Sequence, residues 1–359
     1  MKFKIAVDAM GGDFAPHKIV EGAVLAAQYK QVEIILVGKE NLIKNELSKY
    51  PETEHLSISI QHASEVIEME DSPSQASKTK KDASIVVATK LVAQGKADAV
   101  VSAGNSGAVM TSALRYLGRI EGIYRPAIAT LIPTLKNNNS HCIVCDVGAN
   151  SDCKPEYLLQ FAIMSKILAN TLLHIKNPKI GLLSIGEEKE KGNHLTKETS
   201  PLLESCQEIN FIGNVEGRDI PKGKADVVVC DGFVGNVLLK TMEGTADCIS
   251  KMIKTEITNS LQAKIGYLFM KSAFKNFRKR MDSSEYGGAP LLGVKGVCII
   301  SHGKSTAKAI KNAIKVAEQI VAKKVNQEIH DEIQRTFRND FIVSDSMTLE
   351  SPEKNIINF

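Results

Sequence analysis

Ala225-Asp-Val-Val-Val-Cys-Asp-Gly-Phe-Val-Gly-Asn-Val-Leu-Leu-Lys240 is a stretch in which we expect a strand, a glycine turn and a helix in succession. The β-branched run 227–230 is typical of a strand buried on both faces. Gly232 and Gly235 allow a turn that a ligand can approach closely. Helical spacing of apolar residues begins after Asn236. Because the first N–H groups of a helix have no partner within it, the stretch predicts an anion site at a sheet edge.

The same pattern, K-A-D-x-V-V-x-x-G-x-x-G, occurs at 96–107 and again at 224–235. Two copies indicate two equivalent strand–loop–helix units. The K-A-D-x-V-V part is also an ordinary way for an exposed turn to enter a buried strand, but that alternative does not explain the paired glycine turns. Both glycine loops are therefore candidates for binding a small anion.

Strand-like runs that end in small or polar residues alternate with helical patterns along the chain. Strands are expected at 3–7, 32–37, 99–101, 142–145, 180–184, 227–230 and 297–300. Helices are expected at 17–29, 83–95, 107–118, 155–174, 194–206, 237–258 and 307–321. This alternation predicts an α/β fold with three layers, αβα, and a mostly parallel sheet whose ligands bind at the carboxyl ends of the strands.

Length and composition indicate an ordinary soluble protein with one large domain. The 359 residues are 43% hydrophobic and 24% charged, which is typical of a globular chain. We expect a single α/β domain over 1–330, with a helical excursion at about 250–285, and a polar tail over 331–359. The net charge of +4 argues against a general nucleic-acid binder. Seven scattered cysteines favour a reducing cytoplasm, and no apolar run approaches the ~20 residues of a membrane-spanning helix.

Several familiar motifs are absent or incomplete. No G-x-G-x-x-G follows the first strand, which argues against a dinucleotide dehydrogenase. Gly303-Lys-Ser305 resembles the end of a phosphate-binding P-loop, but Cys298 stands where its first glycine belongs. His302 follows a strand without a G-x-S-x-G elbow, so a structural or ligand-binding histidine is expected rather than a base. Cys142-Ile-Val-Cys145 lacks a second cysteine pair, and we expect no metal site.

A charged loop, Glu187-Glu-Lys-Glu-Lys-Gly-Asn193, follows the expected strand at 180–184. A lysine such as Lys191 at that edge can neutralise a phosphate as a point charge. The alternative is a solvated run of charges on a surface loop, which is the usual fate of such strings.

Seven motifs together resemble those of the PlsX-type phosphate acyltransferases of bacterial phospholipid synthesis. They are Asp8-Ala-Met-Gly-Gly-Asp13, Ser102-Ala-Gly-Asn-Ser-Gly107, Asp146-Val-Gly-Ala-Asn150, Lys191-Gly-Asn193, Asn210-Phe-Ile-Gly-Asn-Val-Glu216, Asp231-Gly-Phe-Val-Gly-Asn236 and Glu285-Tyr-Gly-Gly-Ala289. The resemblance covers residues 1 to about 325. It implies transfer of a fatty acyl group from acyl carrier protein to inorganic phosphate, giving acyl phosphate for phosphatidic acid synthesis. It also implies a fold similar to phosphotransacetylases and isopropylmalate dehydrogenases, a homodimer and peripheral attachment to a membrane.

This chemistry needs neither metal, cofactor nor covalent residue, because phosphate is already an anionic nucleophile and a thioester is already activated. The enzyme must hold both reactants and stabilise the oxyanion. The resemblance assigns catalysis to Lys191 and Asn236, although Asn236 also fits a helix cap. Asp8 and Asp13 are expected to hold lysines or glycine-loop amides in place without contacting the substrate themselves. The expected substrate-binding residues are Gly11, Gly12, Gly104, Asn105, Ser106, Gly107, Asn150, Asn193, Asp231, Gly232, Gly235 and His302. Alternatives are a phosphotransacetylase acting on coenzyme A thioesters and a membrane scaffold without catalysis.

A basic amphipathic stretch spans 260–282. One helical stripe, with basic residues beside it, has the composition of a helix lying in a membrane interface. The stripe and its basic residues are Tyr267, Met270, Phe274, Phe277 and Met281, with Lys264, Lys271, Lys275 and Arg278. A dimer contact or core helix and a docking site for the acidic carrier protein are the alternatives, and the resemblance favours an anionic membrane surface.

Overall fold

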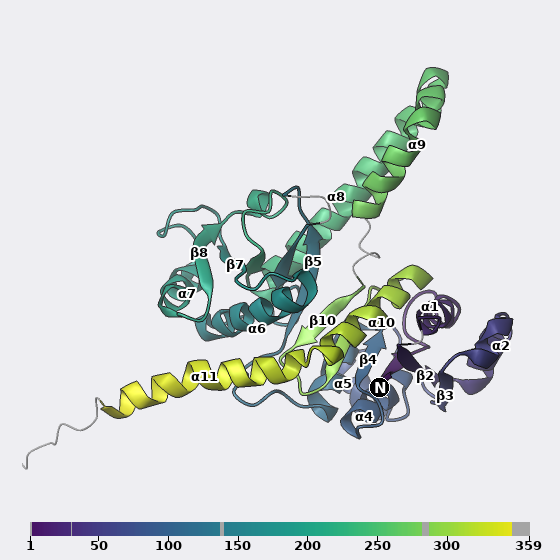
Figure 1. Ribbon diagram of the computed structural model, residues 1–359, viewed down its shortest axis with the longest axis horizontal. Helices are drawn as coiled ribbons and strands as arrows, with labels where there is room; N and C mark the ends of the chain where they lie inside the picture. The colour runs from purple at the N-terminus through teal and green to yellow at the C-terminus, as the bar shows by residue number, and fades with distance from the viewer. Residues whose placement is uncertain (1, 30, 137–139, 282–286, 347–359) are drawn as a thin grey trace, which may run out of the picture.

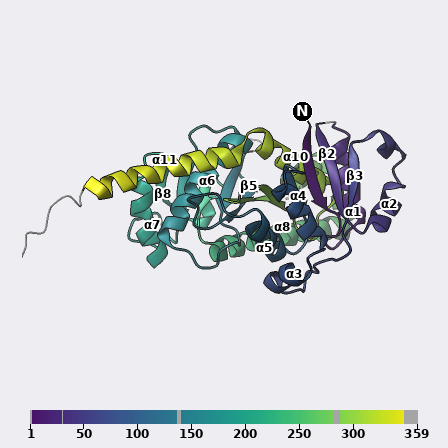
Figure 2. The ribbon, with the colours of Figure 1, turned by 90° about the horizontal axis from the view of Figure 1, so that it is seen from below.

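The computed structural model describes residues 2–29, 31–136, 140–281 and 287–346, and within them it shows an eleven-stranded sheet between two layers of helices (Figure 1). Figure 2 shows α6, α10 and α11 along one face of the sheet and α3, α5 and α8 along the other. Successive residues of the buried strands point to opposite faces, so each face has its own apolar core. The expected αβα fold is therefore confirmed.

The strands follow the order β3-β2-β1-β4-β11-β10-β5-β6-β9-β7-β8 across the sheet. Their bounds are β1 Phe3–Asp8, β2 Val32–Gly38, β3 Ile58–His62, β4 Ala99–Ser102, β5 Ala127–Pro133, β6 His141–Cys145, β7 Lys179–Leu183, β8 Asn210–Val215, β9 Val227–Val229, β10 Ala289–Leu292 and β11 Val297–Ile300. The expected strands all form. The sequence patterns do not predict β3, β5, β8 and β10, of which β3 and β8 are edge strands without a continuous buried run.

The expected helices all form close to their expected positions. The helix bounds are α1 His17–Ala27, α2 Glu40–Leu47, α3 Pro73–Thr79, α4 Ser84–Ala93, α5 Ser106–Tyr116, α6 Pro155–Leu173, α7 His194–Ser205, α8 Gly232–Asn259, α9 Leu261–Met281, α10 Ala307–Ala322 and α11 Val325–Ser346, with short 3-10 turns at Pro51–His55 and Gly217–Asp219. Helix α8 begins five residues earlier than expected, and the sequence patterns do not predict α2 and α3. In the described part of the chain, no helix is long and apolar enough to cross a membrane.

The sheet consists of two parallel halves that run in opposite directions. One half holds β1 to β4 and β11, and the other holds β6 to β9. Between them β10 pairs antiparallel with β11 and β5, and β5 pairs antiparallel with β6. The glycine turns that follow β4 and β9 therefore lie at the ends of strands that run in opposite directions, and not at one rim of a parallel sheet. Because neighbouring strands twist by roughly 20–25°, the five steps from β4 to β9 rotate the strand direction by roughly 100–125°, which lets the two rims converge on one cleft.

Helices α8 and α9 form a long hairpin that projects from the body of the molecule (Figure 1). The carboxylate of Asp231 caps α8 by accepting the N–H of Val234 at 2.9 Å. The helix therefore begins at Gly232, and Asn236 lies within it. The alternative that Asn236 caps this helix is wrong, because an aspartate already stands one turn earlier.

Helix α11 corrects the expected polar tail over the range 331–346. It packs on α6 and contacts α10, with Ile329 and Ile333 buried. The carboxylate of Glu332 accepts the ammonium of Lys166 of α6 at 2.8 Å. The sequence of this helix is mostly polar because, over its described side chains, only a narrow stripe that includes Val325, Ile329 and Ile333 is buried. Residues 347–359 of the expected tail lie outside the described part.

Candidate functional site

An open cleft of about 620 Å³ lies where the two halves of the sheet meet. Ser106 of α5 and His302, which follows β11, come from one half, whereas Gly148 and Asn236 come from the other. The cleft thus brings together loops that follow β4, β6, β9 and β11. Four of the seven sequence motifs contribute residues to the cleft although they stand far apart in the chain, namely the motifs at 102–107, 146–150, 231–236 and 285–289.

Two helices begin at this cleft. Helix α5 starts at Ser106, and Thr306 is the N-cap of α10. Each cap occupies one first-turn donor, since Asn105 accepts the N–H of Ala108 at 3.1 Å and Thr306 accepts that of Ala309 at 3.3 Å. Because a helix has four unsatisfied N–H groups at its start, further donors are available to an anion, and both helix dipoles favour negative charge there.

The loops that follow β1 and β4 are held together by a buried carboxylate. The hydroxyl of Ser102 donates to Asp8 Oδ2 at 2.7 Å and accepts the N–H of Gly104 at 3.1 Å. Burial raises the pKa of Asp8, while donors that include Ser102 and the N–H of Met10 oppose the rise. A side chain at Gly11 would place its Cβ 2.5 Å from Asp8 Oδ2 and 2.8 Å from the Gly104 nitrogen. Asp8 therefore orders the glycine loop, in agreement with the supporting position expected for it.

The loops that follow β1 and β11 are joined as well. The N–H of Asp13 donates to the carbonyl of Gly303 at 2.8 Å. Gly12 has φ +103°, where an L side chain is strained. His302 Nδ1 accepts the N–H of Lys304 at 3.1 Å, so a neutral ring carries its proton on Nε2. The imidazole is exposed at the cleft with that N–H available as a donor.

Asp146 plays the same part in the other half, where it is 0% exposed. Its Oδ1 accepts the N–H groups of Ile128 at 3.0 Å, Gly148 at 3.2 Å and Ala149 at 3.0 Å. Its Oδ2 accepts the N–H of Asn150 at 2.7 Å and the side-chain amide of Asn150 at 2.9 Å. Burial raises the pKa of this carboxyl, against the effect of these donors. The sequence motif included Asp146, but sequence reasoning did not predict that its carboxylate accepts the backbone N–H groups of the 146–150 loop.

The first turn of α8 packs directly on the 146–150 loop. The N–H of Gly232 donates to the carbonyl of Asn150 at 2.7 Å. A Cβ at Gly235 would lie 1.9 Å from the carbonyl oxygen of Asp146. These glycines are therefore required by the close approach of protein backbone, and Asn150 donates its side-chain amide to Pro126 and Asp146. Their expected contact with substrate stays a prediction.

Three polar residues expected to bind substrate act as helix caps. Asn105 caps α5 and donates its amide to the carbonyl of Met69 at 3.0 Å, which ties down the 68–71 segment. Asn193 caps α7 by accepting the N–H of Thr196 at 2.9 Å. Asp231 caps α8, as described above. Gly107 lies against Pro73 of α3 rather than in the cleft lining.

Lys191 does not line the cleft. It lies on the loop that follows β7, next to β9 in the sheet, and its side chain is exposed. The loop is ordered by backbone contacts, since the N–H of Lys191 donates to Glu188 at 3.1 Å and Ser184 donates to the Lys191 carbonyl at 3.3 Å. The structure therefore brings α5 and α8, the helices that follow Gly104 and Gly232, to one cleft, whereas Lys191 lies on the loop after β7 and outside the cleft lining.

The remaining cleft wall combines apolar side chains with residues that sequence reasoning missed. The apolar members are Ile128, Leu131, Val147, Leu239, Ala289, Ile300 and Ala309. Lys240 and Lys304 supply positive charge, and Lys240 is paired with Glu243 at 2.9 Å. Ser301 is 4% exposed, and its hydroxyl has no hydrogen-bond partner among the described residues. The turn before α10 could have been found from Ser301-His-Gly-Lys-Ser305, a polar run that follows a strand.

In the described ranges no group of three or more His, Cys, Asp or Glu side chains is placed to hold a metal ion. The cleft lining combines the N-termini of α5 and α10 and the lysine Lys304, which favour an anion, with apolar side chains. That arrangement suits a reaction between a small anion and an acyl group.

The α8–α9 hairpin exposes a different apolar set from the one expected. The rings of Tyr267 and Phe274 contact each other, with centres 5.4 Å apart, and both are half-buried. The large exposed side chains of α9 are Leu261, Ile265, Leu268, Phe269, Met270 and Phe277. Phe269 is 84% exposed. Met270 and Phe277 of the expected stripe are among these exposed residues, and the side chains of Arg278 and Met281 lie outside the described ones, so the stripe stays a prediction.

Comparisons with known proteins bear on both family and fold. Residues 3–328 match a family model described as fatty acid synthesis protein. The chain is 57% identical over 310 residues to a phosphate acyltransferase of Dictyoglomus turgidum, covering 86% of this chain and 91% of the relative. It is 54% identical over 310 residues to a phosphate acyltransferase of Geobacter sulfurreducens, covering 86% and 88%.

Two solved structures share the fold at low sequence identity. A phosphotransacetylase from Streptococcus pyogenes superposes with a TM-score of 0.59 at 17% identity, covering 89% of this chain and 94% of that chain. A branched-chain phosphotransacylase from Enterococcus faecalis gives 0.56 at 17% identity, covering 89% and 99%. The expected similarity to the phosphotransacetylase fold is confirmed.

Proposed function

The chain belongs to the phosphate acyltransferase family and is an acyltransferase, and we propose that it transfers a fatty acyl group from acyl carrier protein to inorganic phosphate. The acyl phosphate would serve phosphatidic acid synthesis. The observation that carries the substrate assignment is the cleft, which joins two helix N-termini to an apolar wall. The first feature suits phosphate, and the second suits the acyl thioester.

In the proposed reaction a phosphate oxygen attacks the thioester carbonyl carbon. The carbonyl electron pair moves onto oxygen, and collapse of this oxyanion breaks the C–S bond. The carrier leaves as a thiolate that takes up a proton, and the acyl group remains on phosphate through a new C–O bond. The protein holds the two reactants in contact and stabilises the oxyanion, so no covalent enzyme intermediate forms.

Asn236 is the residue we propose to donate a hydrogen bond to the phosphate or the thioester oxygen. It lies on the cleft wall, exposed, 3.7 Å from where a Cβ of Gly148 would stand. The N–H groups at the start of α5 and the Nε2–H of His302 are further donors. Phosphate bound between Ser106 and Thr306 would be within the field of both helices.

Lys191 is proposed to neutralise phosphate or oxyanion charge, which requires its loop to bend toward the cleft when substrates bind. Lys191→Ala should then lower kcat and raise the KM for phosphate, with the melting temperature unchanged. Lys189→Ala on the same loop is the matched control, because that lysine is paired with Glu204 at 2.7 Å. Equal kinetics of both variants and the unaltered enzyme would remove Lys191 from the mechanism.

The decisive experiment supplies purified protein with acyl carrier protein thioester and phosphate, without added metal. We expect equal amounts of acyl phosphate and free carrier thiol. A well-folded protein that forms neither product is not this enzyme. A higher kcat/KM with the coenzyme A thioester of the same acyl chain would instead assign it to phosphotransacetylase-type chemistry.

We also propose that the hairpin attaches the protein to an anionic membrane surface. Leu268 and Phe269 are 69% and 84% exposed on α9, in the same helix as Lys264, Lys271 and Lys275. Apolar burial and attraction to anionic lipid then add together. Leu268→Glu/Phe269→Glu should abolish flotation with phosphatidylglycerol vesicles. Flotation that survives both changes would refute membrane attachment through α9.

A homodimer is proposed on the exposed apolar base of α8. Phe233, Val234 and Val237 are 64%, 38% and 52% exposed and lie within four residues of one another. A second copy would cover this patch. Sedimentation should give a dimer for the unaltered protein and a monomer for Phe233→Asp/Val237→Asp, and a monomeric unaltered protein would contradict the proposal.

A further inference from the structure

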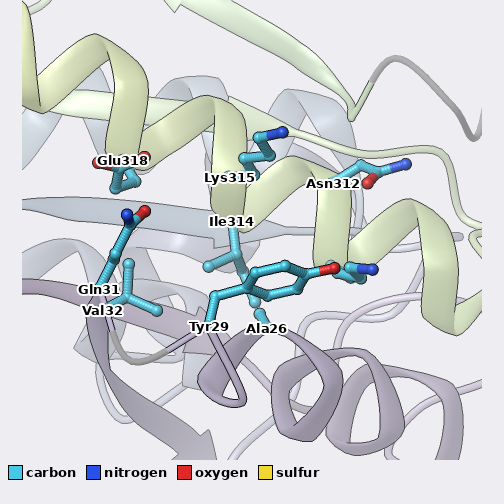
Figure 3. Close-up of a pocket in the computed structure, with 9 residues that line it drawn as sticks. Ala26, Tyr29, Gln31, Val32, Asn312, Ile314, Lys315 and Glu318 are labelled. Carbon is cyan, nitrogen blue, oxygen red and sulfur yellow. The ribbon is translucent and has the colours of Figure 1, made fainter.

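Helix α10 connects the cleft to a second hollow. Its beginning lines the cleft through Thr306 and Ala309. Farther along, Asn312, Lys315 and Glu318 line a separate groove of about 280 Å³, facing residues at the end of α1. Figure 3 shows Tyr29 lying across this groove with its hydroxyl directed along α10. Ala309 and Lys315 are six residues apart, which is roughly 9 Å along a helix.

The solvent face of α10 is basic. Lys308, Lys311 and Lys315 stand at positions i, i+3 and i+7, so they share one side of the helix. Lys304 precedes them at the cleft, and Glu318 is the one acidic residue within the helix. Lys304, Lys311 and Lys315 form no ion pair with a carboxylate of the residues that the structure describes. No carboxylate of the described residues therefore neutralises the charge of Lys304, Lys311 or Lys315.

Tyr29 sets the shape of the groove. Its ring lies 4.8 Å from the ammonium of Lys311, and a hydrogen bond from Lys311 lowers the pKa of the tyrosine hydroxyl. Tyr29 is 63% exposed. An aromatic ring beside a hollow and two lysines can receive an apolar side chain of a partner, while the lysines contact its carboxylates.

The basic face of α10 differs from the basic face of α9. On α9 lysines stand among large exposed apolar side chains such as Leu268 and Phe269, which suits lipid. The described part of α10 exposes no large apolar side chain, and Tyr29 is the single aromatic beside it. Charge without an apolar face suits the surface of an acidic protein. The two surfaces therefore fit different partners.

We propose that this face of α10, with the Tyr29 groove, docks the acidic carrier protein that delivers the acyl thioester. The proposal rests on the proposed function, since it assumes that the acyl donor is carried by a protein. A carrier seated over Lys311 and Lys315 holds its thioester arm beside Thr306, at the mouth of the cleft. Complementary charge would raise the rate of encounter and fix the orientation of the carrier.

The test compares two charge reversals of equal size. Lys311→Glu/Lys315→Glu alters the proposed surface, and Lys176→Glu/Lys197→Glu alters exposed lysines in the other half of the sheet. We expect the first variant to raise the KM for acyl carrier protein thioester by about tenfold at low salt, with a smaller effect at high salt. The control should match the unaltered enzyme. Neither variant should change kcat/KM for a coenzyme A thioester of the same acyl group.

Each other outcome decides the matter. Equal KM values for the reversal and its control, with the unaltered enzyme active on the carrier substrate, would overturn docking on α10 and leave the proposed function intact. A raised KM for Lys264→Glu/Lys271→Glu instead would move the docking site to α9. An unaltered enzyme inactive with the carrier substrate would refute the proposed function itself. Circular dichroism checks the fold, and Lys311→Gln/Lys315→Gln repeats the test with a milder change.

Discussion

Asp146→Asn should destabilise the 146–150 loop, which lines the cleft. All five contacts of the Asp146 carboxylate come from donors: three N–H groups, of Ile128, Gly148 and Ala149, on Oδ1, and both the N–H and the side-chain amide of Asn150 on Oδ2. Burial raises the pKa of this carboxyl. A proton on either oxygen, however, would point at N–H groups that are themselves donors. The ionised form is therefore the one that the loop accommodates at neutral pH.

An asparagine at position 146 keeps the oxygen that serves three backbone donors. Its amide nitrogen, however, would face both donors of Asn150. Two hydrogen bonds to a charged group are lost, each worth roughly 1.5–3 kcal/mol, so we expect a loss of roughly 3–6 kcal/mol. The same substitution at Asp231 is the control, because asparagine caps a helix as well as aspartate does and should change stability by less than about 0.5 kcal/mol.

Guanidinium unfolding at pH 7.5 or so, followed by circular dichroism, measures both variants, and amide hydrogen exchange reports on 146–150 directly. We expect faster exchange in that loop for Asp146→Asn and not for Asp231→Asn. Should Asp146→Asn prove as stable as the unaltered protein, with protected loop amides, the carboxylate does not hold the loop. Its assignment as the residue that orders this side of the cleft would then fail.

Other predictions concern the cleft, the last helix and pH. Asn236→Ala should lower kcat by roughly 10²–10³-fold, because it removes a hydrogen-bond donor to the developing oxyanion. The melting temperature should not change, since the Asn236 side chain is exposed, and an unchanged kcat in steady-state kinetics would contradict the proposed role. Ile333→Ala should lower the free energy of unfolding by roughly 2–5 kcal/mol, because this 1% exposed side chain packs beside Gly122. A loss below about 1 kcal/mol in denaturant unfolding would show that α11 is not part of the core. Burial raises the pKa of Asp8 above 3.8, so the folded state binds a proton at this carboxyl more tightly than the unfolded state does. The stabilisation that this bound proton gives is lost as pH rises through the folded pKa. Asp8→Asn should therefore gain stability relative to the unaltered protein as pH rises from the ordinary carboxyl range through the folded pKa of Asp8. An unchanged or falling difference in unfolding midpoint over that rise would contradict this sign.

The sequence by itself determined the layers of the fold and the position of most elements. Runs such as 227–230 are buried on both faces, and their continuous apolar character is a local property that needs no tertiary information. The same holds for α6 and α10, whose periodic apolar residues predicted their ends within a few positions. The glycines that follow the strands were also visible, because such turns need residues without a side chain.

Only the tertiary structure decided how those strands are joined and therefore where the cleft lies. The short β10 and the strand β5 reverse the direction of half the sheet, and nothing in the apolar run of β5 indicates which way it pairs with its neighbours. Whether a polar residue caps a helix or faces a ligand also depends on its neighbours in space. Asp231 and Asn236 are similar side chains five residues apart, yet Asp231 caps α8 and Asn236 lines the cleft. Local patterns report burial, because burial is repeated at every turn of a helix and every second residue of a strand. Relative direction and distance between elements are set by contacts between residues remote in the chain, and no local pattern encodes them.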